Sequence, residues 1–144
     1  MLLTAQAERW PIAGAFTIAR GSKTEAHVVV VEITDDGAVG RVEAVPYGRY
    51  GETVESVLAQ IAGLPPRFDR AALQTLLPPG AARNAVDCAL WDLEAKQTGR
   101  PVWDIAGLTE PGPVTTCYTL SLGTPQAMAV AAATPAAAPT ATHI

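Results

Sequence analysis

The sequence predicts an α+β fold, in which a three-stranded antiparallel sheet is followed by a helical bundle and then by one further β/α unit. Two observations carry this prediction. Residues 26–45 contain two runs rich in β-branched residues around Asp36-Gly37, a pattern typical of a β-hairpin. From residue 54 to residue 98 the apolar residues recur instead at helical spacing. Strands followed by helices indicate an α+β domain.

Three strands are expected at residues 2–10, 26–33 and 39–45. The first two are separated by residues 11–25, which contain glycines and show no settled hydrophobic period. We therefore expect a long loop there. Long loops in compact domains are often functional, so this segment is a candidate part of a site.

Three helices are expected after the sheet. The first begins behind Thr53 as its N-cap and ends at Gly63, and the second begins behind Asp69. The third lies between Gly80 and Gly99 and carries an apolar stripe of small side chains. Small side chains allow close approach, so this helix is predicted to dock tightly against a large element.

The chain then returns to a β/α pattern. Residues 114–122 are expected to form a strand, followed by a helix that opens at Pro125 and runs to about residue 133. Prolines and small residues from residue 134 onward exclude a continuous helix, so a disordered tail is expected. The expected domains are residues 1–112, residues 113–133 and the tail at residues 134–144.

Charge and hydropathy exclude several classes of protein. The net charge is −4, the isoelectric point is about 5.0 and the basic residues are scattered, so we expect no nucleic-acid binding. The sequence has no apolar run of about 18 residues and no signal-peptide pattern, so we expect a cytoplasmic protein without a membrane partner. Cys88 and Cys117 form no C-x-x-C pair, which predicts buried, reduced thiols.

Three segments carry a family resemblance. They read DCALWDLEAK at residues 87–96, VPYGRYGET at residues 45–53 and TCYTLSL at residues 116–122. Together they resemble dipeptide epimerases of the muconate-lactonizing branch of the enolase superfamily, over about residues 1–130. The sequence departs from the family at Val42, where a glycine is usual in a G-x-G-E pattern. A β-branched residue would strain the backbone there if the family's glycine adopts positive φ.

The resemblance implies both a fold and a reaction. The sheet and helices would be the N-terminal capping domain, and residues 113–133 the first unit of an incomplete (β/α)₈ barrel, since a whole barrel needs about 250 residues. The family removes and returns the α-proton of dipeptides such as L-Ala-D/L-Glu, using two barrel lysines and Mg²⁺ held by barrel carboxylates. Because no lysine follows Lys96 and only one barrel strand is expected, we expect neither the two bases nor the trio of metal-binding carboxylates, and hence no catalytic residue, metal ligand or cofactor in this chain itself.

The resemblance also implies which residues touch the substrate. Two loops of the capping domain close over the barrel mouth in this superfamily, and they match residues 16–23 and 46–51. Arg20 in the first loop is expected to bind the terminal carboxylate of a dipeptide, because a guanidinium can hold a carboxylate through two parallel hydrogen bonds. The alternative is an ordinary exposed arginine.

Three further residues are candidates for substrate binding. Tyr47 and Tyr50 in the second loop would shield the site from water, although Tyr50 would equally well pack under the first helix. Thr119 on the single barrel strand would point its hydroxyl at the substrate, or would simply fill a strand position as β-branched residues do.

Two classes of function stay open. The chain is either the capping domain of a dipeptide epimerase or of a sister enzyme, such as muconate cycloisomerase, o-succinylbenzoate synthase or N-acylamino-acid racemase, or it is a non-catalytic α+β binding module. In the first case the partner is a small-molecule substrate, and homo-oligomer formation is left open. A K-x-K strand encoded soon after residue 133 would favour the enzyme, and a genuine stop would favour the module.

Overall fold

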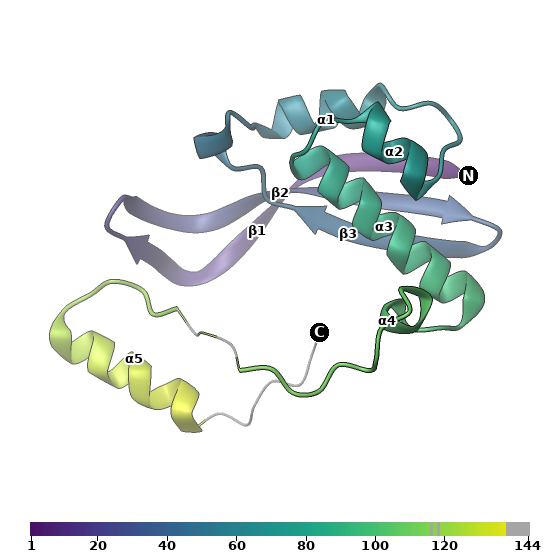
Figure 1. The fold of residues 1–144 in the computed structure, drawn as a ribbon. Coiled ribbons are helices and arrows are strands. Elements are labelled where there is room, and N and C mark those ends of the chain that lie inside the picture. Colours follow the sequence, from purple (N-terminus) through teal and green to yellow (C-terminus); the bar gives the residue numbers. More distant parts are fainter. Residues whose placement is uncertain (116, 118, 138–144) are drawn as a thin grey trace. The chain divides into compact units, whose positions relative to one another are not determined.

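The computed structural model of the chain describes residues 1–115, 117 and 119–137 (Figure 1). Contacts divide the chain into two compact units. The main unit comprises residues 1–10 and 26–111, and the second unit comprises residues 11–25 and 112–144.

The sheet has three antiparallel strands in the order β1-β2-β3. Their bounds are Leu2–Ile18 for β1, Gly21–Asp35 for β2 and Ala38–Ala44 for β3. The prediction of a loop at residues 11–25 is wrong, because β1 and β2 continue through this segment up to a tight turn at Ala19-Arg20. Backbone pairing can build a hairpin without a regular apolar alternation, so the hydrophobic pattern gave no signal.

The turn between β2 and β3 follows the sequence closely. Asp36 and Gly37 have φ angles of 47° and 78°, the positive values that a two-residue hairpin turn with right-handed strand twist requires. Pairing then runs from Asp35 opposite Ala38 to Val29 opposite Ala44. The predicted hairpin is confirmed.

The helices of the main unit begin and end where their caps predict. Thr53 and Ser56 form a reciprocal capping box at the start of the first helix, and Asp69 Oδ1 accepts a hydrogen bond from the Ala72 amide at 2.7 Å in the second. Gly99 ends the third helix in a left-handed conformation. The bounds are Gly48–Tyr50 for the short 3₁₀ helix η1, Val54–Ala62 for α1, Arg70–Leu76 for α2, Ala81–Thr98 for α3, Val102–Ile105 for α4 and Pro125–Ala137 for α5.

The core of the main unit lies between the sheet and helices α1, α2 and α3, which cover one face of it (Figure 1). Its buried apolar residues are Val29, Val31, Ile33, Ala44, Val57, Ile61, Leu73, Leu77, Ala82, Ala85, Val86, Ala89, Leu90 and Leu93. Helix α3 comes so close to β3 that a Cβ atom on Gly40 would collide with the carbonyl oxygen of Ala89 and lie 2.7 Å from the amide nitrogen of Leu93. The predicted tight docking of this helix is confirmed.

Val42 causes no backbone strain. It lies in β3 opposite Val31, without a positive φ, and packs its side chain against the core. The expected strain at this departure from the family pattern is therefore wrong, because extended strand geometry suits a β-branched residue.

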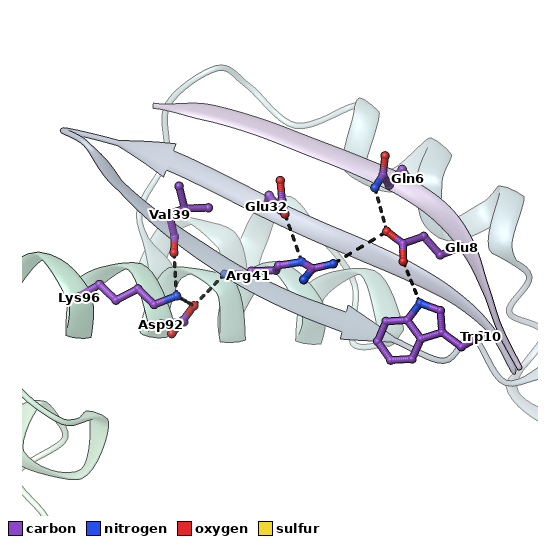
Figure 2. Close-up of polar contacts among 8 residues, drawn as sticks. All are labelled: Gln6, Glu8, Trp10, Glu32, Val39, Arg41, Asp92 and Lys96. Atoms are coloured by element: carbon purple, nitrogen blue, oxygen red, sulfur yellow. Dashed lines mark hydrogen bonds and ion pairs between the residues drawn. The ribbon is translucent and has the colours of Figure 1, made fainter. Parts of the chain in front are cut away.

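A cluster of polar side chains lies on the opposite face of the sheet (Figure 2). The Arg41 guanidinium lies 3.1 Å from Glu32 and 3.9 Å from Glu8, so it links β3 to both other strands. Hydrogen bonds from the Trp10 indole and the Gln6 amide, each 2.8 Å long, hold the pKa of the Glu8 carboxyl below its ordinary value. This carboxylate therefore stays charged beside Arg41.

Helix α3 also bonds to the edge of β3 (Figure 2). Asp92 Oδ2 accepts hydrogen bonds from the Arg41 backbone amide at 2.8 Å and from Lys96 Nζ at 2.7 Å. Lys96 Nζ in turn donates to the Val39 carbonyl at 2.8 Å. These contacts tie two helical side chains to the strand backbone.

The second unit differs from the prediction in two places. The described residues of segment 114–122 form no strand, because no neighbouring strand builds a ladder with them; Leu122 donates a single backbone bond to the Thr17 carbonyl at 2.8 Å. Helix α5 opens at Pro125 behind Thr124, as predicted, but continues through Pro135 to Ala137. Its alanines favour a helix strongly enough to carry it past the proline. The remainder of the predicted tail, residues 138–144, lies outside the described residues.

Candidate functional site

Tyr47 and Tyr50 lie together on the segment that joins β3 to α1. Their ring centroids are 5.7 Å apart at an interplanar angle of 61°, an edge-to-face pair. Tyr50 is 76% exposed, so the alternative that it packs under α1 is wrong. The pair forms an exposed aromatic surface on the main unit.

The turn that carries the two tyrosines is fixed by short hydrogen bonds. The Tyr50 amide donates to the Tyr47 carbonyl at 2.9 Å, and the Gly51 amide donates to the Gly48 carbonyl at 3.0 Å. Glu52 then accepts from the Tyr47 amide through Oε2 at 3.2 Å and from the Ala81 amide through Oε1 at 2.6 Å. One carboxylate thus joins this turn to the first residue of α3.

Arg20 occupies the turn at the end of the β1–β2 hairpin, where it is exposed. The hairpin is braced close to the turn, because the hydroxyls of Thr17 and Ser22 lie 2.9 Å apart. Ser121 adds a second brace: its hydroxyl accepts from the Thr17 amide and donates to the Ala15 carbonyl, both at 2.9 Å. The second unit therefore presents Arg20 on a supported hairpin.

Thr119, the remaining candidate, is exposed and lies in the second unit with Arg20. Its neighbours Thr116 and Tyr118 lie outside the described residues. Ser121 stands two positions after Thr119, and the sequence analysis missed it together with Glu52. Both residues act on backbone groups of distant segments, for which local spacing gives no signal.

The described residues do not fit a magnesium site. Mg²⁺ prefers carboxylate and other oxygen ligands gathered at one point, and the part of the chain that the structure describes holds no group of three or more His, Cys, Asp or Glu side chains that could bind a metal. Lys96 is bonded to Asp92 and to the Val39 carbonyl, so it serves the packing of α3 on β3.

A hollow of about 810 Å³ on the main unit is lined partly by Trp91 and Glu94, both from the DCALWDLEAK segment. Arg70 from α2 also lines this hollow. The guanidinium carbon lies 3.4 Å from the centre of the Trp91 ring, and Nη2 lies 2.6 Å from Glu94. Trp91 and Glu94 thus have a structural role, which is to join α2 to α3 through Arg70.

The two cysteines differ in their surroundings. Cys88 is half-buried, but Cys117 is exposed, so the prediction of two buried thiols is wrong for Cys117. This residue belongs to the expected strand that the structure does not form, and it consequently lacks the cover of neighbouring strands. Burial, with a smaller effect of the Asp87 carboxylate, raises the pKa of the Cys88 thiol.

At pH 8, Cys117 is expected to react with iodoacetamide several-fold faster than Cys88. The thiolate is the reactive form, and a raised pKa lowers its fraction at Cys88 while burial limits access. Peptide mass spectrometry over a time course measures both rates, with chain unfolded in urea as the control in which the two rates converge. Equal rates in the folded chain would contradict the difference in environment.

No helix in the described part of the chain is both long and apolar enough to cross a bilayer.

The chain resembles known proteins over most of its length. Residues 2–107 match the sequence model described as the mandelate racemase / muconate lactonizing enzyme N-terminal domain. An L-Ala-D/L-Glu epimerase of Escherichia coli K12 is 49% identical over 131 residues, which are 88% of this chain and 41% of that protein. The chain thus spans about two fifths of this relative's length.

Two solved structures have a similar fold. An enolase family member from Agrobacterium tumefaciens with homology to dipeptide epimerases, with bound sodium and L-Ala-L-Glu, has a TM-score of 0.77 and 47% identity, covering 92% of this chain and 42% of that one. A dipeptide epimerase from Methylococcus capsulatus, complexed with Mg and L-Arg-D-Lys, has a TM-score of 0.80 and 29% identity, covering 94% and 42%. The fold, the matched domain and these similarities agree: the chain belongs to the mandelate racemase / muconate lactonizing enzyme family.

Proposed function

We propose that this chain is the N-terminal part of a dipeptide epimerase acting on L-Ala-D/L-Glu or a related dipeptide, and that it supplies the loops that select the substrate. The observation that carries the proposal is the 49% identity to an L-Ala-D/L-Glu epimerase over 131 residues of the alignment. Residues 1–112 would be the capping domain, and residues 113–133 would open the barrel. The free cysteines support a cytoplasmic location.

In this proposal Arg20 binds a carboxylate of the dipeptide. The residue lies at the turn of a hairpin whose backbone is braced by Ser121 and by the contact between Thr17 and Ser22. The bracing restricts the backbone that carries Arg20, so less conformational entropy is lost when its guanidinium binds a ligand. The planar guanidinium then fixes the orientation of the carboxylate as well as its position.

Tyr47 and Tyr50 would cover the bound dipeptide. An exposed pair of rings with a defined mutual geometry offers apolar surface that excludes water from a charged substrate. Thr119 would add a hydroxyl contact to the dipeptide. The contribution of this chain is then binding and orientation, while proton transfer and Mg²⁺ binding belong to other parts of a complete enzyme.

The test is the Arg20→Ala substitution in a complete enzyme that carries this chain. We expect kcat/KM on L-Ala-D/L-Glu to fall roughly tenfold to a hundredfold, because a charge-assisted contact contributes about 1.5–3 kcal/mol. Arg20→Lys should recover only part, since an ammonium keeps the attraction but not the paired geometry. Steady-state kinetics measure both effects, and the melting temperatures should stay unchanged.

Arg67→Ala is the matched control, because Arg67 is an equally charged, exposed residue that the proposal does not use. Its kcat/KM should equal that of the wild type. An unchanged kcat/KM in Arg20→Ala would rule out the carboxylate role, and a large drop in its melting temperature would indicate a structural arginine instead.

A further inference from the structure

The segment from Tyr47 to Gly51 is held to the rest of the main unit by one carboxylate. Glu52 is half-buried, and its two oxygens bind two different backbone amides, those of Tyr47 at 3.2 Å and Ala81 at 2.6 Å. A carboxylate that accepts backbone N–H bonds makes stronger contacts than a neutral acceptor. The Glu52 side chain therefore fixes the first residue of the segment, Tyr47, and attaches it to the first residue of α3, Ala81.

The attachment point on α3 suits a negative charge. The first turn of α3 contains no acidic residue, and its N-cap, Gly80, offers no side chain to the free amides there. Glu52 replaces that missing cap from another segment, and the partial positive charge of the helix N-terminus adds to the attraction. A Cβ on Gly80 would lie 2.8 Å from Glu52 Oε1, so the glycine makes room for the carboxylate.

Fixing the Tyr47 amide fixes the aromatic pair. The Tyr47 carbonyl accepts the Tyr50 amide at 2.9 Å, which closes the 3₁₀ turn, and the Tyr50 ring then meets the Tyr47 ring edge to face. Helix α3 is itself immobilised, because its stripe of alanines is buried against the sheet. Glu52 consequently anchors the two exposed tyrosine rings to a helix whose own position is fixed by core packing.

We propose that Glu52 is a positioning residue for substrate selection: it holds the segment Tyr47–Gly51 against α3 so that the two tyrosines stand ready to cover a dipeptide. This inference rests on the proposed function. Glu52 itself touches no substrate in it, and its effect passes through the Tyr47 backbone.

Amide hydrogen exchange in the 144-residue chain tests the structural half of the proposal. Thr53, the residue after Glu52, provides a matched control. Its side chain also accepts a hydrogen bond from a backbone amide, that of Ser56. Glu52→Ala should speed exchange at the Tyr47 amide about fivefold or more and leave Ser56 unchanged, while Thr53→Ala should do the reverse. Glu52→Gln keeps one acceptor oxygen, so it should protect only one of the amides of Tyr47 and Ala81. Unchanged exchange at Tyr47 in Glu52→Ala would overturn the proposal.

Kinetics in a complete enzyme carrying this chain test the functional half. Glu52→Ala should raise KM for L-Ala-D/L-Glu about tenfold with kcat within about twofold, and Glu52→Gln should lie between it and the wild type. Thr53→Ala removes a helix cap of comparable strength and should leave KM unchanged. An equal rise of KM in both alanine variants would show a general loss of stability and overturn the proposal. If the wild type does not epimerise dipeptides, the proposed function fails, whereas the exchange experiment still decides whether Glu52 holds the segment.

Discussion

Gly40→Ala is expected to lower the free energy of unfolding of the main unit by about 3 kcal/mol. The added methyl group would collide with the Ala89 carbonyl oxygen and lie 2.8 Å from Leu93 Cβ. Because the nearest atoms belong to the helix backbone, no side chain can rotate away, and α3 must shift from β3 as a whole. Overpacking in a close-packed interior costs about 1–3 kcal/mol, and this site should lie at the upper end.

Urea unfolding followed by circular dichroism measures this effect. Gly48→Ala is the control, since a Cβ at Gly48 meets nothing within 4 Å and the residue has no positive φ. Its midpoint should stay close to that of the wild type. An equally small effect of Gly40→Ala would mean that strand and helix are further apart than the structure places them.

Leu73→Ala should be a comparably damaging change, with a loss of about 2–5 kcal/mol in the free energy of unfolding. The Leu73 side chain is fully buried in the core between α2 and the other elements of the main unit. Its removal exposes no new surface to water but leaves a cavity, and the surrounding side chains lose their contacts with the missing atoms. The cost therefore adds a packing loss to the loss of apolar burial.

Helix α2 provides its own control for this prediction. Leu76 lies on the same helix and is 42% exposed, so Leu76→Ala makes the same chemical change with the same helix propensity. We expect its free energy of unfolding to fall by less than about 1 kcal/mol. Similar losses in the two variants would show that α2 does not face the core as described.

The sequence predicts the main unit well where structure is set by neighbouring residues. The Asp36-Gly37 turn and the caps at Thr53, Asp69 and Gly99 all depend on bonds within a few residues, and all are confirmed. The hairpin at residues 11–25 depends on pairing between two segments whose side chains show no period. For that reason the same analysis misread it as a loop.

The candidate site also depends on contacts between residues that are distant in the sequence, which local patterns do not predict. Arg20, Tyr47, Tyr50 and Thr119 were found by resemblance to a family, and their substrate contacts stay predictions. The contacts that brace their segments join residues 29 positions apart in the case of Glu52 and Ala81, and 104 positions apart in the case of Ser121 and Thr17. An uncapped helix N-terminus, as at Gly80, leaves free amides that a distant side chain can bind, but it does not indicate which residue that is.

The bonds between α3 and β3 have a consequence for how the folded chain meets other copies of itself. Strand β3 forms one border of the sheet, where an added strand from another molecule would bind the outward-facing backbone groups. The Val39 carbonyl and the Arg41 amide are two such groups, and Lys96 and Asp92 already occupy them. An incoming strand would have to displace the ion pair of Lys96 and Asp92 before it could bond to either of these two groups. At Val39 and Arg41 this border of the sheet is therefore protected against the edge-to-edge association by which β proteins commonly aggregate.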